Sequence, residues 1–172
     1  MRGLIPPAAL VLALAACAAP PPPAPGLRDE AVTIASAALF DPARFADVWH
    51  VAAAYGPEAA CGPLAETWVQ TGAGSYDVTG TACGPNGARA FAGRAQVTGP
   101  GRITREGLNG PEVLWVLWVD QDYRVAVIGT PDGRFGRILS RSPKVRPDLM
   151  AAAREVLDFN GYDTGRLGLI GG

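Results

Sequence analysis

The sequence predicts an all-β protein, an eight-stranded antiparallel up-and-down barrel with a C-terminal α-helix packed outside. Three observations lead to this fold class. From Trp49 onward, apolar segments of strand length alternate with Gly, Pro, Asn and Asp turns, which indicates an antiparallel sandwich or barrel. Eight such segments fit a small barrel that can hold one ligand. One helical pattern follows the last of them.

The strands are expected at intervals that the turn residues separate. Two of the segments, Val113–Val119 and Val125–Ile128, are apolar on both faces. One face could line the interior and the other could lie under a helix or a lipid surface. The expected strands cover 48–55, 63–70, 76–83, 88–98, 102–106, 113–120, 123–130 and 135–141.

A helix is expected over 147–159. Pro147 suits the first turn, Asp148 suits the positive end of the helix dipole, and Asn160-Gly161 supplies the stop. Its apolar residues recur every three or four positions, so one stripe should pack on the outside of the barrel. A shorter helical piece near 41–46 should close one end of the barrel.

The length and charge of the chain exclude several function classes. A chain of 172 residues is long enough for one domain and too short for two enzyme-sized domains. With 15 Lys and Arg against 16 Asp and Glu, a nucleic-acid binder held by a basic surface is excluded. The single histidine, His50, disfavours metal sites and histidine-dependent triads. We therefore expect no cofactor, no metal and no enzymatic activity.

The N-terminus is predicted to be a targeting segment. Residues 1–16 have a basic start, an apolar stretch and small residues before Cys17, as in a secretory signal peptide. Leu14-Ala15-Ala16-Cys17 resembles the lipobox of bacterial lipoproteins, in which the cysteine is acylated. Residues 17–26 then form a lipidated, proline-rich tether, and residues 27–172 form the folded domain. Ala18 after the cysteine, in place of aspartate, favours the outer membrane, with the protein facing the periplasm.

Two cysteines remain besides Cys17. In an oxidising compartment an even pair usually forms a disulfide. The midpoint of Cys61 and Cys83 falls in the turn at 72–74, so a hairpin about that turn brings them within reach of each other. Such a bridge contributes roughly 3 kcal/mol in the chain-entropy model.

Three separated motifs resemble the signatures of one family, the lipocalins. The segment 40–52 resembles the first, in which a short helix leads into a strand that begins G-x-W. Asp120, Asp122 and Tyr123 resemble the second, at a turn between two apolar strands. The segment 135–143 resembles the third, and 161–167 is similar to the C-terminal end of bacterial outer-membrane lipoprotein lipocalins.

The resemblance implies an eight-stranded barrel, open at one end, that binds a small apolar molecule such as a fatty acid or lysophospholipid. Asp47 stands where the family usually has glycine, and Arg137 where bacterial members often have an aromatic residue. The family also implies that Trp49 sits at the closed end with Arg141 stacked across it, a structural contact. His50, next along the strand, should face outward.

Arg137 is the most informative candidate for ligand binding. It lies four residues before Arg141 on one strand, so both side chains should point into the barrel. A buried arginine needs a partner, and we hypothesise the carboxylate or phosphate of an amphiphilic ligand. The alternatives are that it pairs with an internal carboxylate such as Glu66 or Glu112, or that a bulge turns it outward.

The apolar lining should come from inward residues of the central strands. Trp115 and Trp118 have opposite parity, so only one of them can face in if the strand is regular. Trp68 and Phe91 are further candidates at the mouth.

The favoured function is a membrane-anchored carrier that transports or stores a small apolar ligand or lysolipid, as a monomer or weak homodimer. The alternative is a structural or interaction lipoprotein with a side-chain-filled barrel. An internal cavity of a few hundred Å³ would favour the carrier.

Overall fold

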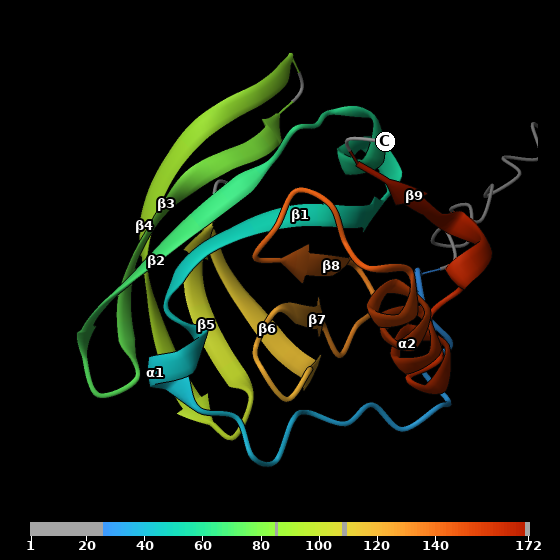
Figure 1. Cartoon of the computed structure of the whole chain (residues 1–172), viewed down its shortest axis with the longest axis horizontal. Coiled ribbons are helices and arrows are strands. Elements are labelled where there is room, and N and C mark those ends of the chain that lie inside the picture. The colour runs from blue at the N-terminus through green and yellow to red at the C-terminus, as the bar shows by residue number, and fades with distance from the viewer. Residues whose placement is uncertain (1–25, 85, 108–109, 171–172) are drawn as a thin grey trace, which may run out of the picture.

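The computed structural model describes residues 26–84, 86–107 and 110–170. The predicted signal peptide, Cys17 and the proline-rich tether up to Pro25 lie outside the described residues. An antiparallel sheet closes into a barrel with a helix on its outside (Figure 1). The elements in chain order are α1 (Pro42–Phe45), β1 (Asp47–Tyr55), η1 (Gly56–Ala60), β2 (Ala65–Gly72), β3 (Ser75–Gly84), β4 (Gly87–Gly99), β5 (Arg102–Gly107), β6 (Gly110–Val119), β7 (Val125–Gly129), β8 (Gly136–Ser140), α2 (Pro147–Phe159), η2 (Thr164–Arg166) and β9 (Leu167–Leu169).

The barrel closes through its first strand. Strands β2 to β8 pair in sequence order, and β1 pairs with both β8 and β2. Residues 47–50 of β1 pair with β2, whereas residues 53–55 pair with β9. Strands β1 and β2 separate after residue 50, and the short strand β9 pairs with the same edge of β1 beyond that point. The predicted eight-stranded up-and-down barrel is confirmed, and β9 is a ninth strand that the sequence pattern did not predict.

The predicted helix over 147–159 is confirmed at both ends. Its stripe packs Ala153 and Leu157 against the outer faces of β6 and β7. A separate apolar cluster fills the interior of the barrel. Apolar residues on both faces of β7 are thereby explained, because Ala126 and Ile128 point inward while Val125 and Val127 lie under α2.

The chain before α1 runs along the outside of the barrel, from the β7–β8 turn past β6 to α1 (Figure 1). Leu27 donates its backbone N–H to Gly133 between β7 and β8, and Ala37 donates to Val116 in β6. Gly101, with φ of 62°, permits the close approach, because a Cβ there would lie 2.9 Å from the nitrogen of Ala37. No helix in the described ranges has the length and apolar character needed to span a bilayer.

The expected disulfide is confirmed. Cys61 and Cys83 are bonded, with their Cα atoms 5.7 Å apart. Strands β2 and β3 form the predicted hairpin, and Cys61 follows directly after η1. The bridge therefore fixes the connection between β1 and β2 to the open end of β3.

The two tryptophans of β6 correct the expectation that one of them faces the interior. Both Trp115 and Trp118 belong to the outer cluster beside α2. The pairing of β6 with β7 shifts between Val116 and Trp118, so the strand is irregular there. Such a bulge changes the alternation by one residue, and both indoles lie on the same outer face.

A charged cavity at the open end of the barrel

Aromatic side chains fill the closed end of the barrel. The ring of Phe45, from α1, lies 5.2 Å from those of Trp49 and Trp68, and Trp68 lies 5.4 Å from Tyr76. The guanidinium of Arg141 stacks 3.7 Å from the Trp49 ring, as the family resemblance implied. It also donates to backbone carbonyls of residues 44–46 and 48. This end of the barrel is packed solid.

The turn between β6 and β7 is built by the second signature motif. The carboxylate of Asp120 accepts the backbone N–H groups of Arg124 and Val125 and pairs with the Arg124 side chain. Tyr123 adopts φ of 55°, and its hydroxyl accepts the N–H of Asp41 at 2.6 Å. Asp122 contributes an exposed ion pair with Arg124. These residues therefore shape the turn and hold α1 against it.

A network of ion pairs lies above the aromatic layer. Glu66 in β2 is completely buried, and its Oε1 accepts both Nη1 of Arg105 at 2.9 Å and Nη1 of Arg137 at 2.6 Å. Its Oε2 accepts the indole N–H of Trp68 at 3.1 Å. Period-two alternation brings Glu66, Arg105 and Arg137 inward from three strands. One carboxylate thus joins β2, β5 and β8.

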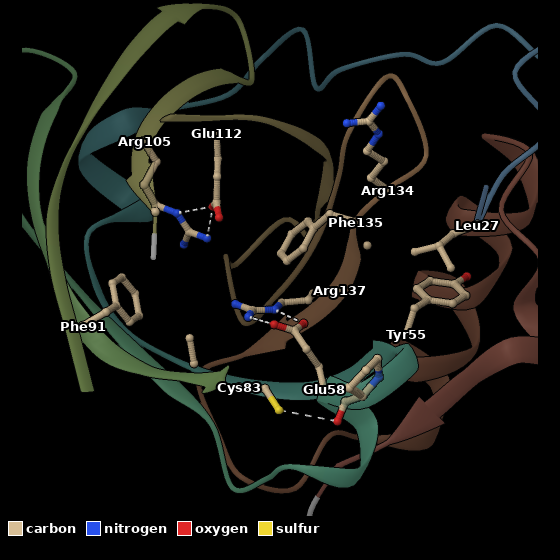
Figure 2. Close-up of a pocket in the computed structure, with 14 residues that line it drawn as sticks. Leu27, Tyr55, Glu58, Cys83, Phe91, Arg105, Glu112, Arg134, Phe135 and Arg137 are labelled. Atoms are coloured by element: carbon tan, nitrogen blue, oxygen red, sulfur yellow. Dashed lines mark hydrogen bonds and ion pairs between the residues drawn. The ribbon is translucent and has the colours of Figure 1, made fainter. Parts of the chain in front are cut away.

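Two more carboxylates complete the network (Figure 2). Glu58 on η1 pairs with Arg137 through both its oxygens, one accepting Nε at 2.8 Å. Glu112 on β6 accepts Nε and Nη2 of Arg105 at 3.1 and 2.7 Å. The Glu112 carboxylate lies directly over the backbone of Gly107, where a Cβ would clash with Oε1.

The electrostatics of Glu66 are set by its two arginines. Burial raises the pKa of this carboxyl, but the charges of Arg105 and Arg137, with hydrogen bonds from Arg105 and Trp68, outweigh that effect and lower it to about 2. Burial in turn lowers the pKa of Arg137, but the hydrogen bonds and charges of Glu58 and Glu66 raise it overall. Glu66, Arg105 and Arg137 are therefore all ionised at neutral pH.

The network forms the floor and sides of a cavity at the open end. The cavity has a volume of about 270 Å³, and an outer groove of about 770 Å³ shares three of its lining residues. Its apolar lining comes from residues that surround the ion pairs (Figure 2). They include Leu27, Tyr55, Pro57, Phe91 and Phe135. In the described part of the chain, no group of residues forms a metal-binding cluster.

The family follows from the sequence over the whole barrel. Residues 40–170 match the lipocalin-like domain. The chain belongs to the lipocalin family. Members of this family generally bind or transport small hydrophobic ligands and are not enzymes. A comparison with functionally curated proteins gave no sequence match.

Solved lipocalins share the fold at low identity. Insecticyanin from the tobacco hornworm Manduca sexta is 18% identical, with a TM-score of 0.64, over 86% of this chain and 87% of that one. A siderocalin, Ex-FABP, described as having dual ligand specificities, is 22% identical with a TM-score of 0.58, over 75% and 95%. Lobster apocrustacyanin A1 is 16% identical, with a TM-score of 0.58, over 74% and 77%.

One departure of this lipocalin from its family signature is visible in the backbone. Asp47, which stands where glycine is usual, adopts φ of 89°. Its side chain accepts the N–H of Val48, which is the local hydrogen bond by which aspartate tolerates this region. His50 lies on the outer face between the inward side chains of Trp49 and Val51, as expected.

The cavity contains only some of the predicted ligand residues. Arg137 and Phe91 line it, whereas Trp68 lies beneath it in the aromatic layer. The donors of Arg137, which we expected to meet a ligand's anionic group, are occupied by Glu58 and Glu66. The internal pairing considered as the alternative is what the structure shows for Glu66, while Glu112 pairs with Arg105 instead.

The sequence pattern missed Arg105, Glu58 and Phe135 as cavity residues. Arg105 alternates with Ile103 on an expected strand, so its inward direction could have been found from the period of two. Glu58 lies on η1, a short 3₁₀ turn between strands, where no alternation in the sequence indicates which way a side chain points. Phe135 lies just before β8.

Proposed function

We propose that this lipocalin is a carrier that binds a small apolar or amphiphilic ligand of the fatty acid or lysophospholipid class at its open end. The observation that carries this proposal is the cavity of about 270 Å³, walled by aromatic and aliphatic side chains above a closed ion-pair floor. Its size is close to the lower end of the range for small-molecule sites, ~300 Å³. A longer acyl chain would extend into the adjoining groove, which shares Glu112, Arg134 and Phe135 with the cavity.

The alternative is a structural or interaction lipoprotein whose barrel is filled by side chains. The packed aromatic layer around Trp49 and Trp68 favours it for the closed half of the barrel. The cavity favours ligand binding for the open half. The two functions therefore differ in what the open half contains in the purified protein.

Native mass spectrometry of the mature protein, followed by lipid extraction, tests the proposal. We expect a single-chain lipid or another small amphiphile to copurify in a stoichiometric amount. A Phe91→Arg variant, which adds a long charged side chain to the cavity wall, should lose this ligand. The matched control is Trp115→Phe on the outer face of β6, which should retain it. Protein that purifies without ligand and binds no single-chain amphiphile in titrations would support the interaction lipoprotein instead.

We also propose that acylated Cys17 anchors the protein to the outer membrane, facing the periplasm, as a monomer or weak homodimer. The positions of Gly26 and Leu27 support an orientation in which the open end of the barrel faces the membrane. Leu27 lines the cavity, and its backbone is hydrogen-bonded to the β7–β8 turn. Nine residues span at most about 30 Å, so an anchor at Cys17 would keep the open end near the lipid surface. Labelling with radioactive palmitate and membrane fractionation of wild type and Cys17→Ser test the anchor. Equal membrane recovery of the two would contradict it.

A further inference from the structure

The two arginines beneath the cavity are already paired with internal carboxylates at every guanidinium nitrogen. Each of the three guanidinium nitrogens of Arg105 and of Arg137 donates to a glutamate. Their side chains are 5% and 2% exposed. Glu58 meets Arg137 through both its oxygens and Glu112 meets Arg105 through Oε2, so a ligand carboxylate would compete with an internal carboxylate at either arginine. The floor of the cavity is therefore a poor site for an anion.

Carboxylates are the groups that the network presents to the cavity. Glu58, Glu66 and Glu112 face the two arginines, so the network has a formal charge of −1. Glu66 is completely buried, whereas the side chains of Glu58 and Glu112 are 22% and 36% exposed and line the cavity. Within the described ranges, Oε1 of Glu112 accepts no hydrogen bond, unlike Oε2. Together with Glu66, the two carboxylates that line the cavity therefore contribute more negative charge than the paired arginines neutralise.

The other groups around the cavity do not reverse this sign. Arg134 lines the rim, but its side chain is 85% exposed and pairs with Asp132 at 3.4 Å. The faces of Phe91 and Phe135 already lie near guanidiniums, at 5.6 and 4.8 Å from ring centre to Cζ. Aromatic faces attract cations, so these walls are compatible with a further positive group.

We infer that the cavity selects an amphiphile with a cationic nitrogen in its head group, an ammonium that pairs with the carboxylate of Glu112 or of Glu58, in preference to one with a carboxylate. This inference rests on the proposed function and narrows its ligand class. The ammonium would neutralise the excess charge of the network, and the apolar part would lie against Phe91, Phe135 and Leu27. Such a group occurs in free alkylamines and in ethanolamine-containing lysolipids.

Calorimetric titration of the full-length mature protein at neutral pH tests the inference with chain-matched probes. Decylammonium, decanol and decanoate share one chain and differ in the head group. We expect decylammonium to bind tighter than decanoate by roughly tenfold or more, the effect of one charge-assisted hydrogen bond. Glu112→Gln and Glu58→Gln should each reduce this preference. Glu106→Gln, on the outer face of β5, is the matched control and should keep it.

A second pair of ligands distinguishes the two sources of the ammonium, free alkylamines and ethanolamine-containing lysolipids. Lysophosphatidylethanolamine and lysophosphatidylglycerol share the phosphate and the acyl chain, and only the first has an amine. Preference for the first, beyond that for decylammonium, identifies a lipid head group. Decanoate or decanol binding as tightly as decylammonium would overturn the inference and leave the proposed function standing. Binding of none of the decyl and lysolipid probes would overturn both.

Discussion

Arg137 on β8 and Glu66 on β2 meet inside the barrel, where Nη1 of the arginine lies 2.6 Å from Oε1 of the glutamate. Strand β1 separates their strands in the sheet, so the pair links walls of the barrel that share no backbone hydrogen bonds. Both side chains are almost fully buried, and each has further partners. Charges taken out of water in this way are tolerated only when every one of them is paired.

Removing the shared carboxylate should therefore destabilise the protein strongly. In Glu66→Gln, Arg105 and Arg137 would lie side by side without the charge between them. We expect a loss of about 3–5 kcal/mol in the free energy of unfolding, measured by urea denaturation. Glu106→Gln removes the exposed partner of Arg94 and should change it by less than about 1 kcal/mol. Equal effects of the two variants would show that the buried network contributes little.

The same carboxyl predicts an acid-dependent loss of stability. Its pKa lies at about 2 in the folded protein, below its usual value of 4.5. Because the folded pKa is the lower one, the stabilisation is complete above about pH 4.5 and disappears as the pH falls toward 2. It amounts to about 3 kcal/mol at neutral pH. Denaturation curves between neutral pH and pH 2 should show a steeper decline for wild type than for Glu66→Gln, and parallel curves would contradict this.

Local patterns in the sequence predicted most of the fold. Alternation and turn residues predicted the eight barrel strands, and proline, spacing and Asn160 predicted α2 with its observed ends. The hairpin between β2 and β3, with its disulfide, follows from the symmetry of the cysteines about one turn. In each case the residues that determine the structure lie near one another in the sequence, so their pattern can be recognised from a single sequence.

The charged network could be predicted only in part. The inward direction of Arg137 follows from its four-residue spacing to Arg141 on one strand. Its pairing with Glu58 does not, because η1 has no sheet register and its position depends on the disulfide and on β9. The outward position of both Trp115 and Trp118 depends on a bulge, and no residue in β6 marks it.

The disulfide should stabilise the open end as well as the whole fold. It joins Cys61, which directly follows η1 and its Glu58, to Cys83 near the end of β3, with a sequence separation of 22. Replacing both Cys61 and Cys83 by alanine should lower the free energy of unfolding by roughly 3 kcal/mol. Hydrogen exchange should also rise at residues 56–62 more than in β6 and β7. Uniform exchange across the barrel would show that the bridge does not hold η1 in place.

The closed end should depend on the shape of the Arg141 side chain as well as its charge. Its guanidinium stacks on Trp49 and donates to the carbonyls of Arg44, Ala46 and Val48, which a lysine ammonium cannot do together. We expect Arg141→Lys to lower the free energy of unfolding by about 2 kcal/mol, the size of a lost cation–π contact and hydrogen bond. Arg146→Lys, which alters an exposed pair with Asp148, is the control and should have little effect. If both variants unfold at the same urea concentration, stacking and carbonyl binding by Arg141 do not stabilise the closed end.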